Sequence, residues 1–125
     1  MKRVMVADDN PIALELAQAA LKSLGCEFRT AADGIEALNQ IRQWLPDLVL
    51  LDLRMPGLDG FGVVDELRRD AVTAALCLVA FTASGMNGDR EKALAYGFDG
   101  YITKPISIAE LRKEVTAWLS RAGNP

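Results

Sequence analysis

The sequence predicts a doubly wound α/β fold, in which a five-stranded parallel sheet is covered by helices on both faces. Residues 48–51 and 76–81 are near-continuous apolar runs, a pattern typical of parallel strands that are buried on both sides. Five short strand-like runs alternate with segments of helical apolar spacing, and the connections between them are short. The composition fits one globular domain, since 50% of the 125 residues are hydrophobic and 25% are charged.

The first unit is a strand, an acidic turn and a helix. Residues 4–7 form a short apolar run that stops at Asp8 and Asp9. Asn10 supplies a helix N-cap, and Pro11 suits the first helical position. The helix is expected to end at Gly25, and its apolar stripe toward the sheet consists of Ile12, Leu14, Leu16, Ala17, Ala20 and Leu21.

The second unit is a weaker strand followed by a capped helix. We expect the strand at residues 28–31, and the spacing of Asp33 and Glu36 indicates a capping box. The helix runs to Trp44, because Pro46 blocks its continuation. Its apolar positions are Ile35, Leu38 and Ile41.

The third unit begins with the strand at residues 48–52, whose last residue is Asp52. After a turn, Asp59 can cap the next helix, which has a charged far end at residues 68–70. The apolar positions of this helix are Val63, Val64 and Leu67.

The fourth unit is the strand at residues 76–81, which ends beside the hydroxyl of Thr82. A helix begins near residues 87–89, and Gly97 is expected as its C′ residue. The apolar positions of this helix are Ala93, Leu94 and Tyr96.

The fifth unit is a short strand at residues 101–103, closed by Lys104 and Pro105, followed by the last helix. Ser107 and Glu110 give that helix a second capping-box pattern. Its apolar stripe consists of Ile108, Leu111, Val115, Trp118 and Leu119.

The composition excludes several classes of function. The chain has no histidine, which removes Ser-His-Asp catalysis, histidine metal sites and a phosphohistidine of its own. The net charge of -3 gives no basic footprint for nucleic acid, and nothing approaches the roughly 18 apolar residues of a membrane span. Cys26 and Cys77 lack metal-binding spacing, so we expect buried reduced thiols and a cytoplasmic protein. Residues 1–122 are expected to form the domain, and residues 123–125 to fray.

The polar residues at the strand ends form the candidate site. The sequence leaves the strand order open, but in the doubly wound order 2-1-3-4-5 the first and third strands are neighbours. Asp8, Asp9 and Asp52 then meet in one crevice at the carboxyl edge of the sheet, where ligands bind in such folds. Thr82 and Lys104 end the fourth and fifth strands, so they reach the same edge.

Three carboxylates in one crevice repel one another, so either one is protonated or a cation holds them together. Mg²⁺ is the favoured cation, because it takes oxygen ligands and combines one or two carboxylates with a substrate phosphate. Asp52 can act as a nucleophile toward phosphorus and form an aspartyl phosphate, while Lys104 neutralises charge on the transferred oxygens. Taken singly, each Asp could be a cap or turn residue, Thr82 a strand former and Lys104 a solvated surface residue. Their joint position at one edge favours the functional interpretation.

Four segments carry a resemblance to a known family. They are residues 6–10, 50–60, 81–83 and 100–105, with the sequences VADDN, LLDLRMPGLDG, FTA and GYITKP. With these segments in this order, the chain resembles the CheY-like receiver domain of two-component response regulators, over essentially its whole length. The resemblance implies a flavodoxin-like fold and a phosphorylation switch.

The resemblance also implies a role for each site residue. Asp52 would be the phosphoacceptor for a histidine kinase or a histidine phosphotransfer protein. Asp9 would be a direct Mg²⁺ ligand, Asp8 would act mainly through water, and the backbone carbonyl of Arg54 would complete the metal site. Thr82 and Lys104 would bind the phosphoryl oxygens.

The resemblance further implies that Tyr101 is an aromatic switch residue and that the bond before Pro105 is cis, which would aim Lys104 inward. Arg54 and Ser84 occupy positions that vary in the family, and they bear on the lifetime of the phosphoryl group. The signal would leave as altered affinity for another protein, not for nucleic acid or a membrane, with the receiver a monomer or a phosphorylation-dependent dimer. Beyond its own phosphotransfer and dephosphorylation, such a protein is not an enzyme.

Three alternatives stay open. A Mg²⁺-dependent phosphatase with a nucleophilic Asp needs a second carboxylate two residues on, where Arg54 stands. A flavodoxin-like cofactor binder needs a phosphate loop after the first strand, where Asp8 and Asp9 would repel a phosphate. The chain could also be a receiver module from a larger response regulator or hybrid kinase, although we expect a complete single-domain response regulator.

Overall fold

The computed structural model describes residues 1–83 and 88–122. Five strands form one sheet: β1 (Arg3–Ala7), β2 (Glu27–Ala31), β3 (Leu48–Leu51), β4 (Cys77–Thr82) and β5 (Gly100–Thr103). The five helices are α1 (Pro11–Ser23), α2 (Gly34–Trp44), α3 (Gly60–Arg69), α4 (Asp89–Tyr96) and α5 (Ile108–Ala122). The predicted tail at residues 123–125 lies outside the described residues.

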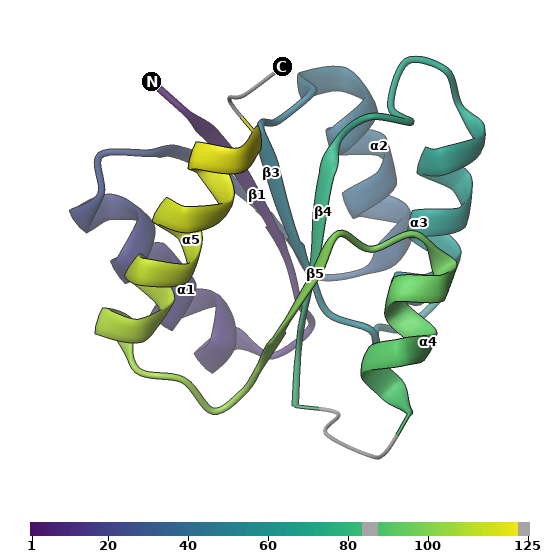
Figure 1. The fold of residues 1–125 in the computed structure, drawn as a ribbon. Coiled ribbons are helices and arrows are strands. Elements are labelled where there is room, and N and C mark those ends of the chain that lie inside the picture. The colour runs from purple at the N-terminus through teal and green to yellow at the C-terminus, as the bar shows by residue number, and fades with distance from the viewer. Residues whose placement is uncertain (84–87, 123–125) are drawn as a thin grey trace.

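The sheet has the order β2-β1-β3-β4-β5, and every neighbouring pair of strands is parallel. The doubly wound fold and the expected strand order 2-1-3-4-5 are therefore confirmed. Figure 1 shows α1 and α5 on one face of the sheet and α2, α3 and α4 on the other. The start of β1 and the end of α5 lie at one end of the sheet, and the connections from β1 to α1 and from β5 to α5 lie at the opposite end.

The sheet is apolar on both faces because successive side chains of a strand point to opposite sides. In β1, Val4 and Val6 belong to the core under α1 and α5, whereas Met5 and Ala7 belong to the core under α2 and α3. The same alternation holds in β3. Burial of each large aliphatic side chain contributes about 1.5–3 kcal/mol to the stability of the fold. The helix layers on both faces of the sheet provide this burial, because they exclude water from the central strands.

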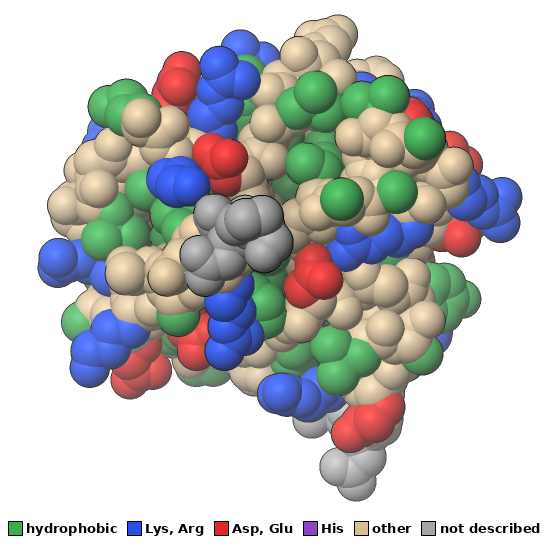
Figure 2. All heavy atoms as spheres, turned by 45° about the horizontal axis from the view of Figure 1, so that its top comes forward, with side chains coloured by type: hydrophobic (Ala, Val, Ile, Leu, Met, Phe, Trp, Pro, Cys, Tyr) green, Lys and Arg blue, Asp and Glu red, His purple; other side chains and the backbone are tan. Residues whose placement is uncertain are grey.

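The surface carries charges of both signs. On the face shown in Figure 2, Lys and Arg side chains are interspersed with Asp and Glu side chains. Such mixing gives that face no single-signed field to attract a polyelectrolyte. Among the described helices, none is both long enough and apolar enough to cross a membrane.

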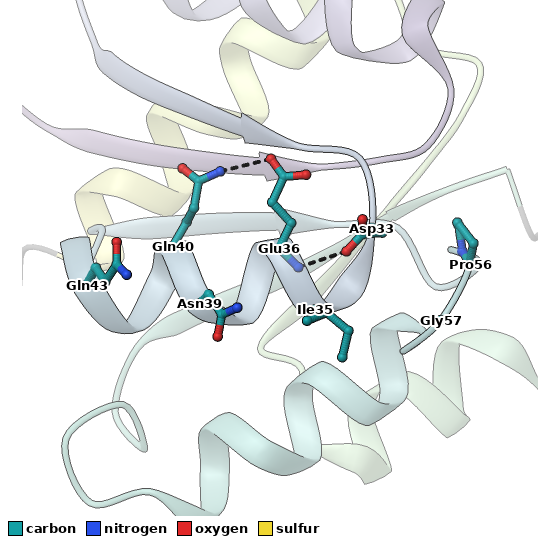
Figure 3. A pocket seen from close by; sticks show the side chains of 8 residues that line it. All are labelled: Asp33, Ile35, Glu36, Asn39, Gln40, Gln43, Pro56 and Gly57. Carbon is teal, nitrogen blue, oxygen red and sulfur yellow. Dashed lines mark hydrogen bonds between the residues drawn. The ribbon is translucent and has the colours of Figure 1, made fainter.

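Each predicted cap side chain accepts a backbone hydrogen bond from the first turn of its helix. The caps are Asn10, Asp33, Asp59 and Ser107, with shortest N···O distances of 2.9, 2.8, 2.9 and 3.1 Å. The Glu36 side chain differs from the capping-box prediction: its carboxylate accepts a hydrogen bond from Gln40 Nε2 at 3.1 Å along its own helix (Figure 3). A favourable cap typically contributes about 1 kcal/mol, so the starts of these helices are well defined.

Several apolar residues assigned to helix stripes are exposed. Ile12 and Ile108 do not lie in the buried stripes expected for their helices, since their exposed fractions are 74% and 42%, and Ile35 is also exposed, at 54%. Ile12 precedes the buried Ala13, and a helix turns by about 100° per residue, so Ile12 points away from the sheet. Leu94 and Tyr96 in α4 are exposed for the same reason, on either side of the direction taken by the buried Ala93.

The two cysteines are only partly buried, which corrects the expectation of buried thiols. Both are free thiols. Burial, followed by the charge of Asp99, raises the pKa of Cys77 to about 11. The Cys77 thiol therefore stays protonated at neutral pH, and its nucleophilicity is low.

Arg68 joins three segments of the chain, although the sequence predicts it only as part of the charged end of α3. Its guanidinium donates hydrogen bonds to the carbonyl oxygens of Gly97, Leu76 and Ala74, at 2.7, 2.7 and 2.8 Å. It also pairs with Asp99 Oδ2 at 3.0 Å. Arg68 thus ties the end of α3 to the α3–β4 connection and to the turn between α4 and β5.

We expect Arg68→Ala to lower the free energy of unfolding by about 2–4 kcal/mol, because several carbonyls lose a charged donor at once. Urea denaturation measures the change. Arg69→Ala is the matched control, since the exposed pair of Arg69 with Asp65, at 3.1 Å, contributes about 0.5 kcal/mol or less. Equal effects of the two substitutions would contradict the joining role of Arg68.

Candidate functional site

The sheet register brings the acidic residues together. Ala7 is paired with Leu51, so the residues that follow β1 and β3 lie side by side at the carboxyl edge of the sheet. The backbone N–H of Asp52 donates to the carbonyl of Ala7 at 2.9 Å and fixes this approach. One carboxylate oxygen from each of Asp8, Asp9 and Asp52 lies within 4.8 Å of the others. The predicted three-carboxylate cluster is present.

The three carboxylates differ in exposure. Asp8 is fully buried and Asp52 is 7% exposed, whereas Asp9 is exposed. Burial raises the pKa of Asp8, and the hydrogen bonds from Lys104 and from the backbone N–H of Asn10 partly oppose this rise. The Asn10 N–H donates to Asp8 Oδ1 at 2.9 Å, a contact that sequence reasoning missed because it assigned Asn10 only a capping role.

Lys104 is part of the cluster and not a solvated surface residue. Its Nζ lies 2.5 Å from Asp8 Oδ2 and 3.3 Å from Asp52 Oδ2, and its side chain is only 14% exposed. The ammonium also lies 5.1 Å from the centre of the Phe81 ring. The bond between Lys104 and Pro105 is cis, as the resemblance implied.

Thr82 and Tyr101 lie on the strands beside this cluster. Thr82 is the last residue of β4, is buried, and its carbonyl accepts a hydrogen bond from the backbone N–H of Lys104 at 2.9 Å. Tyr101 in β5 is partly buried, and burial together with the charge of Asp89 raises its pKa, while Arg54 opposes the rise. The Tyr101 ring therefore lies within electrostatic reach of the start of α4 and of the β3–α3 loop.

Arg54 follows the cluster along the chain. Its backbone N–H donates to Asp52 Oδ1 at 3.2 Å, and its side chain is exposed. This hydrogen bond restricts the orientation of the Asp52 carboxylate. Ser84, the other variable position named above, lies outside the described residues.

The chemistry of this donor set suits a hard divalent cation. Every candidate ligand atom of the cluster is a carboxylate oxygen, which is what Mg²⁺ prefers. A divalent cation would relieve the repulsion that the single charge of Lys104 only partly balances. The residues present therefore fit the metal that the sequence predicted.

A family model for the response regulator receiver domain matches residues 4–116. The chain belongs to this family. As a receiver domain it is a signalling module of two-component systems. This membership argues against the phosphatase and the flavodoxin-like cofactor binder that the sequence left open.

The curated relatives are proteins of several kinds. The chain is 39% identical over 120 residues to a probable transcriptional regulator, ycf27, of Guillardia theta, covering 96% of this chain and 46% of that protein. It is 32% identical to the polar-differentiation response regulator DivK of Brucella anthropi, covering 97% of this chain and 98% of DivK. The chain thus spans about half the length of the first curated relatives and nearly all of DivK.

A solved structure provides a direct comparison for the site. The receiver domain of the sensor histidine kinase PA1611 from Pseudomonas aeruginosa superposes on this chain with a TM-score of 0.86 and is 33% identical to it in sequence. The match covers 95% of this chain and 98% of the PA1611 receiver domain. That structure has a magnesium ion coordinated in its active-site cleft. The similarity in fold is therefore accompanied by a metal site of the expected kind in a relative.

Proposed function

We propose that the receiver is a phosphorylation switch in which Asp52 accepts a phosphoryl group from a phosphohistidine. The observation that carries this proposal is the position of Asp52: its carboxylate lies beside two further carboxylates and 3.3 Å from the ammonium of Lys104. A carboxylate held between a metal-binding cluster and a fixed cation is suited to attack phosphorus.

In the transfer, an oxygen of Asp52 forms a bond to phosphorus while the bond between phosphorus and the donor histidine nitrogen breaks. The electron pair of the broken bond stays on that nitrogen, and the imidazole keeps its proton on the other ring nitrogen. Lys104, released from Asp8, neutralises charge on the phosphoryl oxygens, and the hydroxyl of Thr82 donates a hydrogen bond to one of them. Bound Mg²⁺ would supply further neutralisation of the same oxygens.

The metal would be held unequally by the acidic pair. Asp9 is exposed, and the hydrogen bonds that Asp52 accepts from Arg54 N–H and Lys104 Nζ are long, at 3.2 and 3.3 Å. Asp8 is fully buried and accepts shorter hydrogen bonds from Asn10 N–H and Lys104 Nζ, at 2.9 and 2.5 Å. Asp9 and Asp52 would therefore bind Mg²⁺ directly, with Asp8 acting through water and the Arg54 carbonyl as a further ligand.

We expect Asp9→Ala to weaken Mg²⁺ binding by about 10-fold or more, and Asp8→Ala to weaken it less. Titration of Mg²⁺ against the NMR shifts of the backbone amides measures both affinities. Asp47→Ala serves as a control for loss of charge, because the Asp47 side chain accepts from the backbone N–H of Arg3 at the other end of β1. Binding by Asp9→Ala as tight as that of the original protein would count against this ligand set.

The donor would be a histidine kinase or a histidine phosphotransfer protein, and the output a changed affinity for a partner protein. Phosphorylation places charge beside Thr82, whose movement would allow Tyr101 to turn inward. The surface formed by α4, β5 and α5 would change in response. We propose that the receiver works in the cytoplasm, as a monomer or a phosphorylation-dependent dimer, and that these residues catalyse no reaction beyond self-phosphorylation and dephosphorylation. We also propose that the receiver itself does not bind nucleic acid.

The test uses acetyl phosphate as a small donor. With Mg²⁺, intact-mass spectrometry should show one added phosphoryl group that is stable in acid and lost in base or hydroxylamine. Addition of EDTA before the donor should prevent the labelling. No added mass at saturating donor and Mg²⁺, in protein shown to be folded by circular dichroism, would contradict the proposed function.

Arg54 provides a separate prediction about the lifetime of the phosphoryl group. Its exposed side chain is long enough to approach the phosphoryl oxygens or the attacking water, and both effects belong to the side chain and not to the carbonyl. An exposed contact worth about 1 kcal/mol corresponds to roughly a 5-fold change in rate, so Arg54→Ala should change the dephosphorylation rate by that order while phosphorylation persists. Phosphoprotein decay after removal of the donor measures the rate. An unchanged lifetime would show that the Arg54 side chain does not act on the phosphoryl group or on the attacking water.

A further inference from the structure

Two helices that border the site begin with the same dipeptide. Asp33–Gly34 starts α2 and Asp59–Gly60 starts α3. In each case Asp is the N-cap, and Gly is the first helical residue. Gly is a poorer helix former than Ala, so local helix stability does not explain why Gly stands in both places.

Gly60 stands against the backbone of the acceptor residue. A Cβ at position 60 would lie 2.4 Å from the carbonyl oxygen of Asp52 and 2.8 Å from Cα of Leu53. The N–H of Gly60 donates to the carbonyl of Leu53 at 3.1 Å, which closes residues 53–60 into a loop. Both neighbours are backbone atoms, so no side-chain rotation could make room for a Cβ.

Gly34 holds the same loop from the other side. A Cβ at position 34 would lie 1.7 Å from the carbonyl oxygen of Leu58 and 2.6 Å from its carbonyl carbon. Figure 3 shows the start of α2, with Asp33 and Ile35, beside the part of the loop that carries Pro56 and Gly57. To reach van der Waals distance from such a Cβ, the Leu58 carbonyl would have to move by more than about 1 Å.

We propose that Gly34 and Gly60 are positioning residues for the phosphoacceptor loop, residues 52–60. Rather than touching the reacting atoms, they let the starts of α2 and α3 press directly on its backbone. Gly60 fixes the position of the peptide bond between Asp52 and Leu53, and Gly34 fixes the position of the Leu58 carbonyl in the later part of the loop. The distance between the Asp52 carboxylate and the Arg54 carbonyl is thereby kept fixed. This inference rests on the proposed function of Asp52.

Gly62 provides a matched control within α3. A Cβ at position 62 would come within 2.4 Å of only the far end of the Leu58 side chain, which can rotate away. Gly34→Ala, Gly60→Ala and Gly62→Ala all improve helix propensity by the same change. They differ in whether the new methyl group meets backbone or a flexible side chain.

The experiment measures Mg²⁺ affinity by NMR and the rate of labelling by acetyl phosphate, at a temperature where circular dichroism shows each variant folded. A displacement of about 1 Å at a reacting group can cost about 100-fold in rate, and loss of support behind a metal ligand about 10-fold in affinity. We expect Gly34→Ala and Gly60→Ala to show losses of this order in labelling rate at saturating Mg²⁺ and in Mg²⁺ affinity. Gly62→Ala should keep both values within about 3-fold.

The possible outcomes distinguish failure of this inference from failure of the proposed function. Absence of labelling in the unsubstituted protein would contradict the proposed function and this inference together. Normal labelling and Mg²⁺ affinity in folded Gly34→Ala and Gly60→Ala would overturn the positioning role and leave the function of Asp52 intact. Failure of both variants to fold would assign the glycines to the fold alone, and would also overturn the positioning role.

Discussion

Asp52→Asn should abolish labelling by acetyl phosphate, with a residual rate below about 1% of the original, because an amide cannot form the acyl phosphate. The substitution keeps the size and shape of the side chain. Its Oδ1 can still accept the hydrogen bond from Arg54 N–H, which lies at 3.2 Å in the structure. The fold should therefore survive, and the loss should lie in the chemistry alone. Intact-mass spectrometry after incubation with Mg²⁺ and donor measures it.

Asp59→Asn is the matched control for this experiment. Asp59 lies in the same loop, and its side chain caps α3 by accepting from Gly62 N–H at 2.9 Å. Asn is an equally good N-cap, so this variant should be labelled at the original rate. Full labelling of Asp52→Asn, or equal loss in both variants, would rule out Asp52 as the acceptor.

Lys104→Met should move two measured quantities in opposite directions. The ammonium now lies 2.5 Å from Asp8 and 3.3 Å from Asp52, so it shares carboxylate oxygens with any incoming cation. Its removal leaves the cluster more negative, and we expect Mg²⁺ affinity to rise by about 10-fold. The same removal takes away a charge that stabilises the transferred oxygens, and labelling should slow by about 100-fold.

Lys113→Met controls for the loss of one positive charge, because Lys113 is an exposed residue of α5. It should change neither quantity by more than about 2-fold. Mg²⁺ titration by NMR and acetyl phosphate kinetics test both variants side by side. A fall in Mg²⁺ affinity in Lys104→Met would mean that Lys104 supports the metal site and does not compete with the cation.

The fold could be predicted from the sequence because its signals are local. Apolar runs such as residues 48–51 predict strands buried on both faces, and the caps Asn10 and Asp59 mark helix starts through hydrogen bonds within one turn. The site followed from the fold, since the ends of parallel strands share one edge. Only the strand order was left open, because pairing between strands involves residues distant in sequence.

What the sequence did not predict depends on contacts between elements. The exposure of Ile12 follows from which side of α1 meets the sheet, and apolar spacing describes that direction only roughly. The role of Arg68 depends on three carbonyls brought to it from other segments. The two close approaches at Gly34 and Gly60 involve backbone atoms, which carry no residue-specific signal.

The central claim is that Asp52 carries the phosphoryl group, and reductive trapping tests it most directly. Borohydride reduces an acyl phosphate to an alcohol, and so converts a phosphorylated Asp to homoserine. After treatment with acetyl phosphate, Mg²⁺ and borohydride, peptide mass spectrometry should find homoserine at position 52, and at no other Asp of the cluster. Asp at position 52 in protein that has gained one phosphoryl group, or homoserine at Asp8 or Asp9, would contradict the assignment.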